Sequence, residues 1–154
     1  MNGFDQQKAA RVWQRVQQAQ PQEKPPVHLE ELPELMMNEW SSAAVYRQLG
    51  RQFPGKDGEG YRRLAQREQK HGNCLKGMRF LIHGEKTAMP GTQPVKEPLE
   101  RTLRRCYGNH LRGMKAYETR MDDPEYGPVF GELARQEREN CSIVLELIGN
   151  LGKG

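Results

Sequence analysis

The chain has 154 residues, of which 35% are hydrophobic and 29% charged, and its 24 basic and 20 acidic side chains give a net charge of +4. This length predicts one domain with a sizeable core. No run of about 20 apolar residues is present, which excludes a transmembrane helix, and the segment MNGFDQQKAAR lacks the apolar core of a signal peptide. The three cysteines, Cys74, Cys106 and Cys141, form no Cys-x-x-Cys pair, which excludes a disulfide framework and a four-cysteine metal site. We therefore expect a cytoplasmic protein, and the interleaved basic and acidic residues do not indicate a nucleic-acid partner.

Helical periodicity divides the chain into five segments. Residues 4–20 are predicted to form a Gln-rich helix with a thin apolar stripe, and residues 21–26 (PQEKPP) to form a linker, so that residues 1–26 precede a main domain at 27–154. Four longer helices are predicted over residues 32–53, 60–82, 98–121 and 128–151. Three of them begin with a proline in the first turn, where its missing N–H costs nothing: Pro33, Pro98 and Pro128.

Loop lengths indicate how the four long helices are connected. A short turn at residues 54–59 joins the first two, another at residues 122–127 joins the last two, and a long stretch from His83 to Glu97 separates the pairs. Short connections produce antiparallel hairpins, whereas the long one can cross over the end of a bundle. The sequence therefore predicts an all-α fold, an antiparallel four-helix bundle with one long crossover and an extra N-terminal helix.

Polar residues interrupt the apolar stripe of each long helix near its middle. In chain order they are Glu39, Glu68, His71, Cys106, His110, Glu137 and Asn140. Carboxylates that meet in a core repel one another and are costly to bury, and a divalent cation compensates both effects. The spacing Glu68-x-x-His71 places both side chains on one helix face, within reach of one ion. We interpret the pattern as a metal site formed by Glu39, Glu68, His71 and Glu137, with His110 as a further candidate.

Each of these residues also has a structural interpretation. Glu137 can pair with one of the many arginines, and Cys106 can be a small core residue. His110 can be a core histidine whose hydrogen bonds go to a neighbouring Glu or Tyr, and a polar layer can fix helix register without any metal. Tyr46 and Tyr117, which lie on the same stripes, are assigned to packing.

Three segments resemble a known family. Residues 38–46 (NEWSSAAVY) contain a glutamate followed seven residues later by a tyrosine, and residues 64–71 (LAQREQKH) and 133–140 (LARQEREN) are similar to two further motifs. Over about residues 32–150 the chain resembles the rubrerythrins, within the ferritin-like superfamily. The resemblance implies a non-haem di-iron site in which Glu39 is a terminal ligand, Glu68 and Glu137 bridge, and His71 binds one iron. Family members reduce hydrogen peroxide or activate oxygen.

The chain departs from the family pattern in its second half. Asn140 stands where the fourth-helix histidine is expected, and the inward positions of the third helix hold Cys106 and His110, either of which can replace the glutamate. Because fewer ligands leave a second cation undercompensated, we expect one ion, iron first with manganese or zinc as alternatives, or an empty site. In an empty site Glu68 and Glu137 should have raised pKa values, because burial and mutual repulsion favour the protonated form.

Two classes of function follow from these observations. The first is a metal-binding, rubrerythrin-like bundle with weak peroxide or oxygen oxidoreductase activity. The second is a metal-free structural or protein-interaction bundle that has lost the di-iron chemistry. The N-terminal helix favours the second class, because its thin stripe is unstable alone and must dock on its own bundle or on another subunit. A homodimer is expected by analogy with ferritin-like bundles, no membrane partner is indicated, and the sequence identifies no electron donor.

Overall fold

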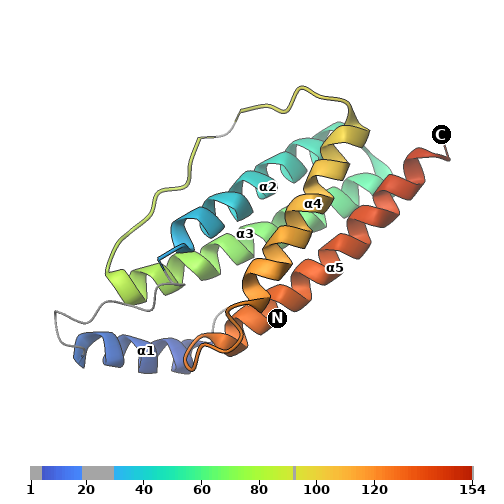
Figure 1. Cartoon of the computed structure of the whole chain (residues 1–154). Helices are drawn as coiled ribbons and strands as arrows, with labels where there is room; N and C mark the ends of the chain where they lie inside the picture. Colours follow the sequence, from blue (N-terminus) through green and yellow to red (C-terminus); the bar gives the residue numbers. More distant parts are fainter. Residues whose placement is uncertain (1–4, 19–29, 92, 154) are drawn as a thin grey trace.

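The computed structural model describes residues 5–18, 30–91 and 93–153, and every regular element in this part of the chain is a helix (Figure 1). The all-α class predicted from the sequence is therefore confirmed. The linker predicted at residues 21–26 lies outside the described residues. The five helices are α1 (Gln6–Gln18), α2 (Leu32–Gln52), α3 (Gly55–His83), α4 (Leu99–Glu118) and α5 (Gly127–Leu151).

In the four long helices, two boundaries differ from the predicted ones by more than one residue. The turn predicted at residues 54–59 is wrong, because α3 begins at Gly55 and only residues 53–54 separate it from α2. Gly55 adopts a φ of 75°, a left-handed conformation that glycine tolerates and that lets the chain reverse in so short a space. Helix α4 ends at Glu118, three residues before its predicted end. The following turn contains Asp123, whose carboxylate accepts the backbone N–H groups of residues 125 and 126 just before α5.

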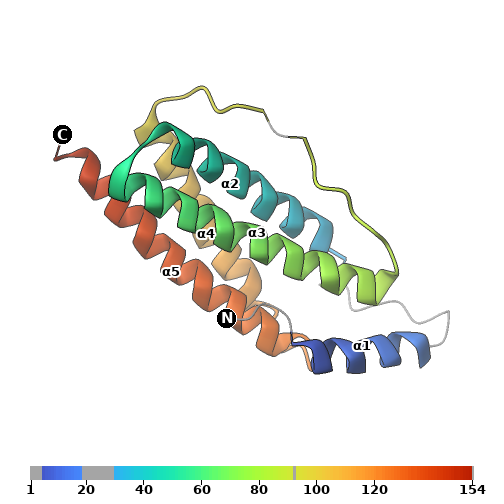
Figure 2. The same cartoon turned by 180° about the vertical axis from the view of Figure 1, so that it is seen from behind.

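The long connection determines how the two helix pairs are oriented. Helix α2 packs along α3, and α4 packs along α5. Residues 84–91 and 93–98 lie along the length of these helices rather than across one end, and α4 begins near the end of the bundle where α3 begins (Figures 1 and 2). Gly84, with a φ of 70°, ends α3 and starts this return. Helices α3 and α4 therefore run in the same direction, and each lies antiparallel to its partner in the pair.

The core has two apolar layers with a polar layer between them. The layer near the start of α2 contains Leu32, Met36, Trp40, Leu75, Met78 and Phe130. The layer at the other end contains Tyr46, Leu49, Leu64, Leu103, Val144 and Leu147. Between them lie the buried polar residues Glu39, Glu68, His71, His110, Glu137 and Asn140. This arrangement follows from the four interrupted stripes, and it shields the polar layer from water at both ends.

Helix α1 docks on its own bundle. Val12 is buried in the first apolar layer, and the ring of Trp13 stacks on that of Phe80 with centroids 5.9 Å apart. Arg15 forms an ion pair with Glu125 in the turn before α5. The sequence left open whether this helix docks on its own bundle or on another subunit. In the structure it docks on its own bundle.

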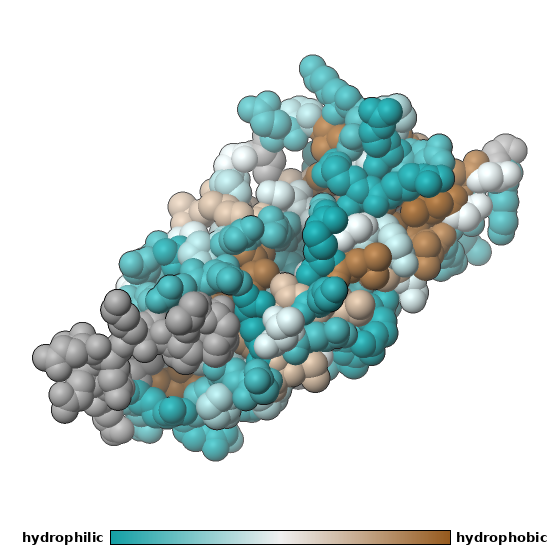
Figure 3. All heavy atoms as spheres, in the orientation of Figure 1, coloured by the Kyte–Doolittle hydropathy of each residue, from teal (hydrophilic) through white to brown (hydrophobic). Residues whose placement is uncertain are grey.

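The molecular surface is largely polar. The face in Figure 3 is dominated by hydrophilic residues, with smaller hydrophobic areas between them. Among the helices that the structure describes, none combines the length and the apolar character that crossing a bilayer requires.

Candidate metal centre

The four residues that the sequence assigns to a metal site meet in the middle of the core. Glu39 comes from α2, Glu68 and His71 from α3, and Glu137 from α5, and each is at most 5% exposed. Each offers one ligand atom, and these atoms all lie within 4.8 Å of one another. The prediction that they face one another in the core is therefore confirmed. The i,i+3 spacing of Glu68 and His71 explains how one helix contributes two of them.

His71 presents one ring nitrogen to the carboxylates. Its Nδ1 atom lies 3.1 Å from Oε1 of Glu137 and 3.5 Å from Oε2 of Glu39. Its Nε2 atom lies 2.7 Å from Oε1 of Gln136, on the outer side of the site. The amide of Gln136 thus fixes the orientation of the ring and directs Nδ1 inward. Gln136 is not among the residues predicted from the sequence, because its position beside Glu137 places it off the apolar stripe.

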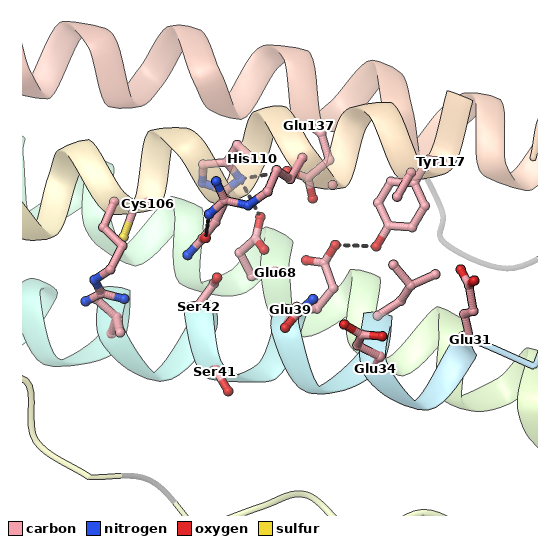
Figure 4. A pocket seen from close by; sticks show the side chains of 18 residues that line it. Glu31, Glu34, Glu39, Ser41, Ser42, Glu68, Cys106, His110, Tyr117 and Glu137 are labelled. Carbon is pink, nitrogen blue, oxygen red and sulfur yellow. Dashed lines mark hydrogen bonds and ion pairs between the residues drawn. The ribbon is translucent and has the colours of Figure 1, made fainter. Parts of the chain in front are cut away.

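The structure also decides between the two candidates on α4. Nδ1 of His110 lies 2.6 Å from Oε2 of Glu137 and 3.5 Å from Oε1 of Glu68, so His110 adjoins the cluster (Figure 4). Cys106 is buried one turn earlier in α4, against the second apolar layer. His110, and not Cys106, therefore occupies the place where the resemblance implies a third-helix carboxylate.

Two tyrosines assigned to packing also form hydrogen bonds with the site. The hydroxyl of Tyr46 lies 2.7 Å from Nε2 of His110, and the two rings stack. The hydroxyl of Tyr117 donates to Oε1 of Glu39 (Figure 4). Burial and the surrounding carboxylates raise the pKa of both phenols well above the ordinary value, so that both stay protonated. The signal in the sequence is a spacing of seven residues, because Tyr46 follows Glu39 and Tyr117 follows His110 at that distance. Each tyrosine therefore lies on the same helix face as that residue.

Asn140 closes the site on the side where the family pattern has a histidine. Its Nδ2 atom donates to Oε1 of Glu68 at 2.8 Å. Its Oδ1 atom accepts a hydrogen bond from Nε of Arg67 at 2.6 Å, and Arg67 also donates to Glu139. A guanidinium therefore lies behind the amide. The sequence analysis missed Arg67, which precedes Glu68 and gives no periodic signal of its own.

Burial and like charge dominate the electrostatics of the carboxylates. Burial, followed by the charges of Glu137 and Glu39, raises the pKa of Glu68 well above its ordinary value. Burial and the charge of Glu39 also raise the pKa of Glu137, although hydrogen bonds from His110 and His71 oppose the rise. Both directions agree with the expectation for this pair of residues in the absence of metal.

The charges of Glu39 and His71 stabilise one another. Burial alone would raise the pKa of Glu39, but the positive charge of His71 and hydrogen bonds from its neighbours bring the pKa below the ordinary value. Burial opposes the charge on His71, but Glu39 and Glu137 outweigh it and raise the pKa of the imidazole to about 10. Without a metal ion, Glu39 therefore stays ionised and His71 stays protonated, whereas Glu68 and Glu137 favour their protonated forms.

One ligand atom of the cluster accepts no hydrogen bond from the described residues, although it lies 3.5 Å from Nδ1 of His71. Oε2 of Glu39 is buried and forms no hydrogen bond in the described part of the chain. A buried acceptor left in this way costs about 1–3 kcal/mol, and more when it is charged. A cation within the cluster would remove that cost. Carboxylate and imidazole donors together suit iron, manganese or zinc, so the residues present fit such an ion.

Comparison with known proteins assigns no relative. The chain matches no family model, no curated protein and no solved structure. The geometry of the site itself is therefore what indicates a function.

Proposed function

We propose that the chain is a ferritin-like bundle, related to the rubrerythrins, that holds one divalent metal ion in a degenerate carboxylate and histidine centre. Iron is the first choice, with weak reduction of peroxide or dioxygen as the activity. The observation that carries the proposal is the convergence of ligand atoms from Glu39, Glu68, His71 and Glu137 within 4.8 Å in the buried core. Oε2 of Glu39, which is buried and accepts no hydrogen bond among the described residues, also supports it.

The course of the chain supports the ferritin-like part of the proposal. Two helical hairpins joined by one long connection along the bundle are typical of the one-crossover class of four-helix bundles. In that class inward glutamates and a Glu-x-x-His pair from facing helices form the metal site. Helix α3 carries such a pair at Glu68 and His71, and α2 and α5 each contribute one glutamate.

The surroundings of Asn140 favour one ion rather than two. A second ion would need a further anionic or imidazole ligand on the α5 side, and Asn140 offers only a neutral amide. Its oxygen already accepts a hydrogen bond from Arg67, and its nitrogen already donates to Glu68. The positive guanidinium behind it would also repel a second cation.

The chain contributes the orientation of the ligands. Bound iron would supply a ferrous–ferric couple able to reduce peroxide. Tyr117 holds Oε1 of Glu39 and leaves Oε2 facing the cluster. His110 holds one oxygen of Glu137, and Gln136 holds the outer nitrogen of His71. Such supporting hydrogen bonds to ligands commonly affect metal affinity 10–100-fold.

A titration with metal tests the proposal. Ferrous iron is added anaerobically to chelator-treated protein, and the bound equivalents are counted. We expect one tight equivalent and slow peroxide turnover. Glu137→Gln should abolish tight binding. Glu146→Gln, an exposed position on the same helix, should leave it intact.

The metal-free structural bundle is the second candidate, because hydrogen bonds within the protein already satisfy every buried side-chain atom of the cluster except Oε2 of Glu39, among the residues described. Absence of iron binding, together with unchanged stability of a Glu68→Gln variant, would favour it. Two tight equivalents followed by rapid peroxide consumption would contradict the one-ion proposal. The homodimer stays a prediction, which sedimentation of the full chain tests.

A further inference from the structure

A cleft between α2 and α4 reaches the candidate metal centre from the surface. It has a volume of about 420 Å³, and Glu39, Glu68, His110 and Glu137 line it (Figure 4). His71 does not line it. The cluster therefore has one side closed by His71 and another side open to the cleft. The volume falls within the range of small-molecule binding sites, about 300–1,000 Å³.

Small side chains on both helices keep the cleft open. Ser41 and Ser42 line it from α2, and Gly113 and Ala116 line it from α4. A Cβ atom at Gly113 would stand 3.7 Å from Cδ of Glu137, so any larger side chain there would extend across this carboxylate. A glycine inside a helix costs about 0.5–1 kcal/mol relative to alanine. Here it leaves Glu137 accessible from the cleft.

A buried acceptor of the candidate metal centre belongs to a residue that lines the cleft, and this atom lies 3.5 Å from Nδ1 of His71. Glu39 is only 5% exposed, it lines the cleft, and its Oε2 atom has no hydrogen-bond partner among the described residues. Unpaired buried acceptors are rare in folded proteins. An ion within the cluster would complete the surroundings of this oxygen, and the cleft leads from that position to the surface between α2 and α4.

A positively charged side chain lies at the rim of the cleft. Arg112 is exposed and donates to the side-chain oxygen of Asn109, and no carboxylate in the described part of the chain pairs with it. Arg105, which also lines the cleft, is instead paired with Glu97 at 2.6 Å. Of the two arginines that line the cleft, Arg112 is thus the one more available to an anion that enters. Two further carboxylates line the cleft, Glu34 and Glu31, of which Glu31 is paired with Arg120.

We propose that this cleft binds a small organic carboxylate, with the carboxylate at Arg112 and the hydrocarbon end directed toward the metal centre. This inference rests on the proposed metal-binding function and adds a class of substrate to it. Hydrogen peroxide has two heavy atoms and would occupy roughly twice the ~30 Å³ share of a water molecule, a small part of the cleft. Apolar lining from Leu35 and Val45 suits the hydrocarbon part of such a ligand.

Paramagnetic relaxation tests the proposal directly. The full chain is loaded with Mn²⁺, and the proton relaxation of hexanoate is measured as a function of its concentration, with hexanol as the uncharged comparison and Zn²⁺ as the diamagnetic blank. We expect saturable relaxation of hexanoate that is strongest at its methyl end, and weaker binding of hexanol. Arg112→Gln should weaken hexanoate binding about fivefold, as expected for an exposed ion pair. Arg104→Gln, an exposed arginine on the same helix, should not.

Variants at Gly113 separate the cleft from the metal site. At a saturating Mn²⁺ concentration, which offsets any weaker ion binding caused by a side chain beside Glu137, Gly113→Leu should lose hexanoate at least tenfold. Gly113→Ala should retain both Mn²⁺ and hexanoate, because its Cβ fits at an ordinary contact distance. If Gly113→Leu does not fold, the comparison of Arg112→Gln with Arg104→Gln decides. Normal Mn²⁺ binding without relaxation of hexanoate, or with equal affinity in all variants, would overturn the cleft proposal and leave the metal site intact. Absence of Mn²⁺ binding would overturn the proposed function, and this inference with it.

Discussion

Replacing Glu68 with glutamine should stabilise the protein when metal is removed. Glu68 is 2% exposed, and burial and the charges of two other carboxylates raise its pKa. Glutamine has the same shape without the charge. Its side-chain oxygen can still accept the hydrogen bond that Asn140 donates to Oε1 of Glu68. The substitution therefore removes a charge while it preserves packing.

The expected gain follows from the distances in the cluster. Glu68 offers a ligand atom within 4.8 Å of those of Glu39, Glu137 and His71. At an effective dielectric constant of about 20, two unit charges at this distance interact by about 3.5 kcal/mol. When all three carboxyl groups are ionised, two carboxylates repel Glu68 and the protonated His71 attracts it, so the net repulsion is about 3.5 kcal/mol. Protonating Glu68 at pH 7 costs about 3.7 kcal/mol from an unfolded-state pKa near 4.3. Whether Glu68 stays ionised or takes up a proton, the free energy of unfolding of the wild type at pH 7 should therefore be about 3 kcal/mol lower than that of the variant.

The gain should depend on pH in a defined direction. Because the pKa of Glu68 is higher in the folded than in the unfolded state, its contribution to stability is fully present below about pH 4.3 and is lost as the pH rises through the folded-state pKa. The advantage of Glu68→Gln should therefore be near zero at pH 4 and grow by about 1.4 kcal/mol per pH unit above that, until the pH reaches the raised folded-state pKa of Glu68. Urea unfolding in the presence of a chelator, at several values between pH 4 and pH 7, measures it.

Metal should remove this advantage. At a metal concentration 100-fold above Kd the wild type gains about 2.7 kcal/mol, and a variant without one ligand gains little. Glu146→Gln, exposed on α5, should stay within about 0.5 kcal/mol of the wild type in both conditions. A Glu68→Gln variant that is less stable than the wild type at pH 7 in chelator would refute the reasoning, because the three carboxylates would then be compensated within the protein.

Three further predictions concern neighbouring residues. Tyr117→Phe removes the hydroxyl that donates to the carboxylate of α2 and should cost about 1–3 kcal/mol in urea unfolding, whereas a smaller effect would mean that the ring acts through packing alone. Gly72→Ala should destabilise by about 1–3 kcal/mol, because a Cβ there would stand 2.4 Å from Nε1 of Trp40. A Cβ at Gly77, on the same helix, would meet no atom within 4 Å, so Gly77→Ala should stabilise the protein by about 0.5–1 kcal/mol. Thermal shifts of the same sign in the two variants would contradict this comparison. Because the pKa of His71 is raised to about 10, metal binding at pH 7 should release at least one proton, which calorimetry in two buffers of different ionisation enthalpy detects; no release would exclude this imidazole as a ligand.

The sequence by itself determined the helical segments and the layer in which the site lies. Periodicity is a local property, so the stripes place Glu39, Glu68, His71 and Glu137 on inward faces whatever the neighbouring helices do. Four stripes interrupted at their middles then require the polar residues to share one layer of the core. Loop lengths likewise determined two hairpins and one long connection, because a short loop can join only helices that lie antiparallel to one another.

Only the tertiary structure decided which side chains meet within that layer. Cys106 and His110 lie four residues apart on one face of α4, so periodicity treats them alike, and the axial position of α4 against α5 brings His110 to Glu137. The bond from Arg67 to Asn140 joins α3 to α5, and no local pattern contains it. The cleft depends on the separation of α2 from α4, and this separation depends on side-chain volumes on both helices and on how each helix packs against its own partner. Periodicity describes each helix alone, whereas the distance, axial position and rotation between two helices are properties of the pair.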